Sequence, residues 1–217
     1  MVAKTFALKS LAGDVVLSAR FAPLIPELIR ATGPISYDYQ FAGPDLLARI
    51  VGASWLRPLT LFAAANVTVA MDGEDLAGLE MGFEGSNFYR FKDNLTTMMG
   101  EIIETGVATL EELRGLGERA EEASYLNAHV PEGVYYIHAL VTPTAHRGRG
   151  AGRLLLDTAV ARARSAGHRE LQLDVLADNP AVAFYQASGL RILSEIRSPR
   201  LSRDHAFPAE LRMAVTL

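Results

Sequence analysis

Residues 147–152 read Arg-Gly-Arg-Gly-Ala-Gly and stand directly before a helical pattern. In such a segment the backbone amides converge, the helix dipole adds partial positive charge, and glycine lets a phosphate approach without a Cβ in the way. The segment therefore indicates an anion site suited to phosphate. A tight strand-to-helix turn that binds nothing is the alternative that the glycines alone leave open.

The residues around the glycines disfavour the common nucleotide loops. A Walker loop needs Lys and then Ser or Thr after its last glycine, whereas Gly152 is followed by Arg153 and Leu154. A dinucleotide fingerprint that starts at Gly148 would require Gly or Ala at position 153, and it usually lies near the start of a chain. Here position 153 is arginine and the segment lies in the last third of the chain.

The elements that must position this loop follow from hydrophobic periodicity. Residues 135–142 form a β-rich run before the loop, and a helix is predicted from about residue 150 to 166, with Gly167 as its C-terminal cap. Further predicted elements of this third are strands at 171–175, 191–197 and 211–217, and a short helix that Asn179 and Pro180 open and Gly189 ends.

The first two thirds predict a strand, two helices, a hairpin and a helical segment. One helix face spans residues 21–29 and is stopped by Gly33 and Pro34, and a second helix starts at Pro44. Asp72 and Gly73 supply turn chemistry between two alternating apolar runs, which predicts a hairpin. The pattern then turns helical and acidic, so we expect an inserted helical segment over about residues 85–132.

The glycine loop resembles motif A of the GNAT superfamily of N-acetyltransferases, Gln/Arg-x-x-Gly-x-Gly/Ala, with Arg147, Gly150 and Gly152 at its fixed positions. Downstream, residues 181–185 followed by Gly-Leu at 189–190 resemble the second signature of that family, Asn-x-x-Ala-x-x-Leu/Phe-Tyr ending in Gly-Phe. The resemblance implies an α/β (α+β) fold in which helices flank a central, mixed, splayed β-sheet, with one domain over residues 1–217 and the helical segment inserted before the central strand.

The same resemblance implies that acetyl-CoA binds in the opening between the strand ending near Thr142 and the strand ending near Ala177. Its pantetheine would pair with the backbone of residues 140–142, and its pyrophosphate would lie on the amides of residues 148–153. No metal is expected. The cofactor-binding residues implied are Leu140, Val141, Thr142, Arg147, Gly148, Arg149, Gly150, Ala151, Gly152, Arg153, Asn179 and Phe184.

The chemistry implied by the resemblance is direct transfer of an acetyl group from the thioester to a primary amine of a small molecule or peptide. Tyr185 matches the tyrosine that commonly protonates the departing thiolate, and a phenol with a pKa of about 10 is protonated at neutral pH. A packing role on a short amphipathic helix is the alternative.

His138-Ala139-Leu140 resembles a run in the central strand of arylalkylamine N-acetyltransferases, where the histidine helps to remove the amine proton. An imidazole suits that task directly or through water. Glu80, Glu84 and the acidic helical segment are alternative sources of the base.

Two departures from the family pattern leave alternatives open. Three residues separate Pro143 from Arg147, one more than is usual, so the face of the sheet that His138 presents is open. Counting back from Tyr185 places the Asn of the signature at Asp178, so either Asp178 or Asn179 faces the cofactor.

Bulk properties restrict the function class further. The formal net charge of −4 over 217 residues argues against a nucleic-acid binder. The absence of cysteine excludes disulfides and thiolate zinc sites and fits a reducing compartment. With no signal-peptide pattern or membrane-length apolar run, we expect a cytoplasmic protein without a membrane partner. A homodimer is left open, as is a catalytically silent acyl-CoA-binding sensor or interaction module of the same fold.

Overall fold

The computed structural model describes residues 6–217, through which a seven-stranded sheet runs in the order β1-β2-β3-β4-β5-β7-β6. Its β4 and β5 pair in parallel, whereas the other neighbours are antiparallel, so the sheet is mixed as predicted. The strands are β1 (Ala7–Ser10), β2 (Val67–Asp72), β3 (Asp75–Glu84), β4 (Val134–Val141), β5 (Glu170–Leu176), β6 (Arg191–Ile196) and β7 (Glu210–Thr216).

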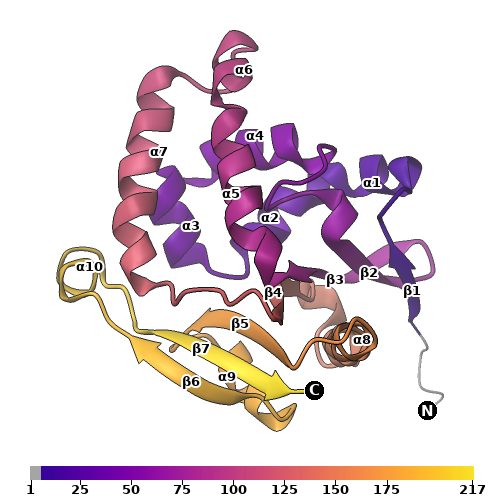
Figure 1. Cartoon of the computed structure of the whole chain (residues 1–217). Helices are drawn as coiled ribbons and strands as arrows, with labels where there is room; N and C mark the ends of the chain where they lie inside the picture. Colours follow the sequence, from indigo (N-terminus) through magenta and orange to yellow (C-terminus); the bar gives the residue numbers. More distant parts are fainter. Residues whose placement is uncertain (1–5) are drawn as a thin grey trace.

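Helices cover both faces of the sheet (Figure 1). One face carries α1 (Val15–Phe21), α2 (Ile25–Arg30), α3 (Pro34–Phe41), α4 (Pro44–Trp55), α5 (Phe88–Thr97), α6 (Met99–Glu104) and α7 (Leu110–Ala123). The other carries α8 (Ala151–Ser165) and α9 (Ala181–Ala187), and α10 (Pro199–His205) joins β6 to β7. The predicted arrangement of a mixed sheet flanked by helices is confirmed.

Each face of the sheet buries its own apolar core. Ile25 and Trp55 pack with Val69 and Met81 between the first helices and the sheet. Leu156 of α8 belongs to a second cluster that joins β4, β5, β7 and α9. The sheet is therefore held between two packed layers, and its strands cannot shift without disturbing both.

The prediction of two helices before the hairpin is wrong. Pro23 and Pro26 each lie in the first turn of a short helix, where the missing N–H of proline costs no hydrogen bond, and the placement of a proline in the first turn agrees with the sequence pattern. What the pattern does not predict is α1 before them. Pro34 begins α3, a helix at a point where the sequence pattern indicates only a stop. Between β1 and β2 the chain therefore forms four α-helices, α1 to α4, where two are predicted.

The helices α5, α6 and α7 lie within residues 85–132, where a helical segment is expected. The last of these begins with a capping box in which Thr109 and Glu112 bond each other's backbone amides. That this segment is an insertion into one domain stays a prediction.

The parallel pairing of β4 with β5 is short. It runs from Val134 opposite Glu170 to Ile137 opposite Leu173 and then ends. On the other edge of β4, Gly82 pairs with Ile137 and Met81 with Ala139, so His138 is an extra residue in the register, as in a β-bulge. The two strands part from this point, which gives the predicted splayed sheet.

A buried ion-pair network braces the sheet beside this gap. Arg212 of β7 donates to Asp174 of β5 (2.8 Å) and to the backbone carbonyls of Ala128 (2.7 Å) and His129 (2.9 Å). Its side chain is 3% exposed, and that of Asp174 is 9% exposed. Tyr136 of β4 donates to the same carboxylate (2.9 Å), so β4, β5 and β7 share one charged centre.

Replacing Arg212 should destabilise the fold severely, because it would leave the Asp174 carboxylate buried without its charged partner. We expect Arg212→Leu to lower the free energy of unfolding by about 3–5 kcal/mol, as measured by urea denaturation. The control is Arg203→Leu, because Arg203 makes the same type of Arg–Asp pair with Asp204 at the surface, with 72% of its side chain exposed. Equal stability of the two variants would contradict the role given to Arg212.

Candidate active site

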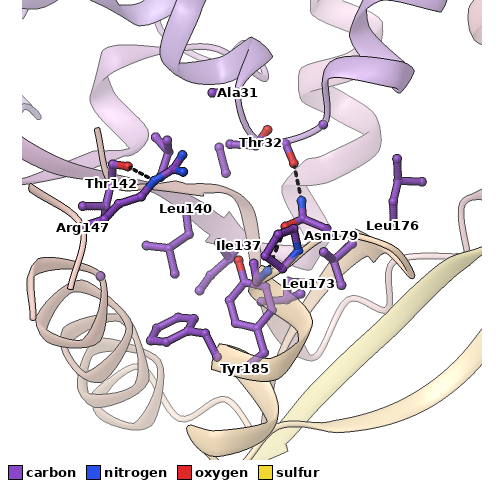
Figure 2. Close-up of a pocket in the computed structure, with 18 of the residues that line it drawn as sticks. Ala31, Thr32, Ile137, Leu140, Thr142, Arg147, Leu173, Leu176, Asn179 and Tyr185 are labelled. Atoms are coloured by element: carbon purple, nitrogen blue, oxygen red, sulfur yellow. Dashed lines mark hydrogen bonds between the residues drawn. The ribbon is translucent and has the colours of Figure 1, made fainter. Parts of the chain in front are cut away.

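A cleft of about 800 Å³ opens where β4 and β5 separate. The ends of both strands form its floor, the glycine loop with the start of α8 forms one wall, and α9 forms another. The turn between α2 and α3 lies on the opposite side, where Ala31 and Thr32 face Asn179 and Tyr185 across the opening (Figure 2). Four segments far apart in the sequence thus meet around one space.

The glycine loop has the backbone geometry of an anion cradle. Gly148 (φ 72°) and Gly150 (φ 94°) adopt left-handed conformations that favour glycine. The amide of Leu154 donates to the carbonyl of Gly150 (3.0 Å), so the three amides before it are the orphan donors of the first turn of α8. A Cβ at Gly152 would lie 3.2 Å from Oγ1 of Thr142, so the helix start packs closely on the end of β4.

The arginines of the loop differ in where they point. Arg147 and Arg153 line the cleft; Arg147 Nε donates to the Thr142 carbonyl (3.2 Å), as Figure 2 shows. Arg149 is outside the cleft lining, and its guanidinium bonds Asp72 of β2 (2.6 Å). The side chain of Arg149 therefore ties the loop to the sheet.

The remaining predicted residues do meet at the cleft. Leu140 and Val141 lie at the end of β4, beyond the point where β5 leaves it, and Thr142 follows directly after the strand. Phe184 and Tyr185 come from α9, with their ring centroids 5.3 Å apart. The lining also includes Gly148, Gly150, Ala151 and Gly152 of the loop.

Tyr185 is held in a mostly apolar environment. The residue is 6% exposed, and Figure 2 shows the ring rising from α9 into the cleft. Burial raises the pKa of its phenol to about 12, so the hydroxyl is protonated across the physiological range.

His138 lines the cleft on the face of the sheet that α1–α7 cover. Its ring lies near those of Phe62 (5.6 Å) and Phe83 (6.2 Å). Its Nε2 is shut off from solvent and has no hydrogen-bond partner in the described part of the chain. Burial lowers the pKa of the imidazole to about 4, so the ring is neutral at pH 7. The contacts with Phe62 and Phe83 thus show which face of the sheet His138 presents.

The alternative bases do not reach the cleft. Glu80 is fully buried, and it bonds Arg162 of α8 (2.6 Å) and the Tyr135 hydroxyl (3.0 Å). It therefore serves as the anchor of α8 on the sheet. Glu84 ends β3 and is exposed outside the cleft lining.

Both residues that the signature left open line the cleft, and the amide of Asn179 already has two protein partners. Its Oδ1 accepts from the backbone N–H of Ala181 (2.9 Å), and its Nδ2 donates to the carbonyl of Thr32 (3.1 Å). Asp178 lies beside it with its side chain exposed. Asn179 thus joins the start of α9 to the turn on the other side of the cleft.

Some residues of the cleft lining carry no recognisable signal in the sequence. Residues 31–35 indicate only the end of a helix, because Gly33 and Pro34 have no chemical signature. In the sequence, His146 is one of the residues between Pro143 and the loop, and Asp174 is a polar residue in a strand with alternating apolar residues; both line the cleft. The alternation does place Asp174 on the opposite face from Leu173, which is the one usable signal.

Metal sites and membrane spans are both missing from the part of the chain that the structure describes. Within residues 6–217, no group of three or more His, Asp or Glu side chains could hold a metal ion. None of the described helices is long and apolar enough to cross a membrane.

Comparison with known proteins adds a family match. Residues 87–190 match the family model described as the acetyltransferase (GNAT) family. The matched stretch contains β4, the glycine loop, α8, β5 and α9, which together build most of the cleft. Among curated proteins, none matches the chain significantly.

Solved structures share the fold. The N-acetyltransferase from Staphylococcus aureus Mu50 gives a TM-score of 0.69 at 16% identity, over 96% of this chain and 100% of that chain. The GCN5-related N-acetyltransferase from Kribbella flavida gives 0.57 at 18% identity, over 98% of each chain. At such identities the likeness shows the fold alone.

The lowered pKa of His138 should make the protein sensitive to acid. Because the folded state resists protonation of a ring that the unfolded state protonates below about pH 6.5, stability falls as pH drops from 6.5 towards 4. Between pH 7 and pH 4.5 we expect the wild type to lose about 2 kcal/mol more unfolding free energy than His138→Leu. Urea denaturation at both pH values measures this, and equal losses in the two proteins would contradict it.

Proposed function

The chain belongs to the GNAT acetyltransferase family, and from that premise we propose that it is an acyltransferase that moves an acetyl group from acetyl-CoA to a primary amine of a small molecule or peptide. The observation that carries the proposal is the set of orphan amides at the start of α8, which open into the cleft between the separated strands. The family match includes both features.

The cleft suits the parts of acetyl-CoA. Orphan amides and the dipole of a 15-residue helix favour a pyrophosphate at the glycine loop, and Arg147 and Arg153 add positive charge at the same end. In the described part of the chain β4 has no β5 partner beyond Ile137, so the backbone of residues 140–142 is available to pair with an extended pantetheine. Phe184 lies opposite, on α9.

Acetyl-CoA supplies an activated acyl group, and the residues of the chain position and protonate the reacting atoms. The amine nitrogen bonds to the thioester carbonyl carbon as the carbon–sulfur bond breaks. The nitrogen loses one proton to water, the departing thiolate takes up one from its acid, and that acid is reprotonated from water. Tyr185 is the proposed donor of the thiolate's proton or of a hydrogen bond to the sulfur, because its phenol stays protonated in the cleft.

His138 is the proposed partner of the amine. Its ring lines the cleft and its Nε2 has no other partner within the described residues, but that atom is closed off from solvent. The proposed bond to the amine, direct or through a water, therefore requires the ring to turn towards the cleft. A pKa of about 4 makes the ring a weak base, which suits orienting a neutral amine better than holding its proton.

Calorimetry with CoA tests the cofactor proposal. We expect the wild type to bind CoA saturably and Gly150→Asp to weaken binding by about 100-fold or more, because a carboxylate would face the pyrophosphate. The matched control is Gly167→Asp at the other end of α8. Gly167 also has a positive φ (82°), and a Cβ there also meets nothing within 4 Å. Binding lost equally in both variants would point to backbone strain, and binding kept in both would mean that the loop is not the phosphate site.

Release of free CoA with a panel of amines tests the transfer, and Tyr185→Phe tests its acid. The substitution keeps the ring that packs on Phe184 and removes only the hydroxyl. We expect kcat to fall about 10- to 100-fold while CoA affinity changes less than about twofold. An equal loss in both quantities would make Tyr185 a packing residue. A wild type that binds CoA but transfers to no amine would support the silent acyl-CoA-binding alternative.

A further inference from the structure

The α2–α3 turn is a preformed unit. Arg30 and Asp38 join the two helices by paired hydrogen bonds of 2.7 Å each. Oγ1 of Thr32 donates to the Ile29 carbonyl (2.7 Å), and the amide of Gly33 donates to the Arg30 carbonyl (3.2 Å). With these bonds the turn keeps its own shape, and its place relative to the cleft depends on what it touches outside itself.

The contact that joins this unit to the opposite wall is the hydrogen bond from Asn179 Nδ2 to the Thr32 carbonyl (3.1 Å). Figure 2 shows the two groups meeting across the cleft from layers on opposite sides of the sheet. The other end of the same amide is held by the N–H of Ala181 (2.9 Å), which fixes the rotamer of Asn179. Donor and acceptor are therefore both committed to the chain itself.

We infer that Asn179 is a positioning residue that holds the α2–α3 turn in place as the acceptor-side wall of the cleft. That this wall faces the amine acceptor rests on the proposed function. The positioning role of Asn179 differs from the cofactor contact that its place in the signature implies. Thr32 and Ile35 of the turn line the side of the cleft across from Tyr185, so a displaced turn would change the space open to the amine.

The substitution Asn179→Ser removes the bond to the Thr32 carbonyl and keeps the bond from the Ala181 N–H, so it tests the two contacts of the amide separately. A serine oxygen can still accept from the N–H of Ala181, as it does at helix starts, but it is too short to reach the Thr32 carbonyl. Asn94→Ser is the matched control, because Asn94 Nδ2 makes the same kind of bond to the Leu59 carbonyl (2.8 Å) away from the cleft lining. Asn179→Ala provides a second variant in which both contacts are lost.

Three measurements test the positioning role: amide hydrogen exchange of residues 31–37 without ligand, CoA affinity by calorimetry, and steady-state kinetics with an amine that the wild type acetylates. For Asn179→Ser we expect exchange in the turn and KM for the amine each to rise about fivefold, with kcat and CoA affinity within about twofold of the wild type. Asn94→Ser should leave all of these values unchanged. Asn179→Ala should resemble Asn179→Ser in the turn.

Unchanged exchange in the turn of Asn179→Ser would overturn the inference. So would CoA affinity weakened about fivefold with the KM for the amine unaltered, because Asn179 would then be a cofactor ligand. Failure of the proposed function looks different. A wild type that acetylates no amine removes the transfer reaction, while the exchange of the turn still decides whether Asn179 holds it.

Discussion

The separation of β4 from β5 is the constraint on which the rest of the molecule depends. Parallel pairing ends at Ile137 opposite Leu173. Beyond this point the facing edges of the two strands have backbone groups that are not paired with each other, and an extended ligand can bond to them. A sheet opened in this way would be unstable if its strands were free to close or slide. The two packed layers and the Arg212–Asp174 centre hold β4, β5 and β7 in place, so the gap persists.

Polar groups around the gap are divided between holding the sheet and facing the cleft. Glu80 and Arg212 bear buried charges, and both are engaged with partners on the strands or on α8. Arg149 is likewise used to fasten the glycine loop to β2. The groups that face the cleft include the backbone amides of the loop, the Tyr185 phenol and the His138 ring, and the charged side chains Arg147, Arg153 and Asp178. The phenol and the imidazole are neutral at pH 7.

The sequence predicted the half of the site that local rules control. Glycines at 148, 150 and 152, the helix that follows them and the strand before them depend on contacts within a few residues, and these predictions agree with the structure. The role of Arg149 and the fate of Glu80 depend on partners 77 and 82 residues away, which no local pattern contains. The α2–α3 turn could not be predicted for the same reason, since its contact with Asn179 spans 147 residues.

The electrostatics of the cleft bear on the state of the amine. Positive charge gathers at the loop end, with Arg147 and Arg153, and that end suits phosphates. At the other end His138 is neutral, and Asp174 already bonds Arg212 and Tyr136, so neither of these two residues offers a free counter-charge to an ammonium ion. Desolvation in such a place favours the neutral form of an amine, as it does for the imidazole itself. For the proposed amine acceptor, the surroundings of His138 therefore favour the neutral, nucleophilic form.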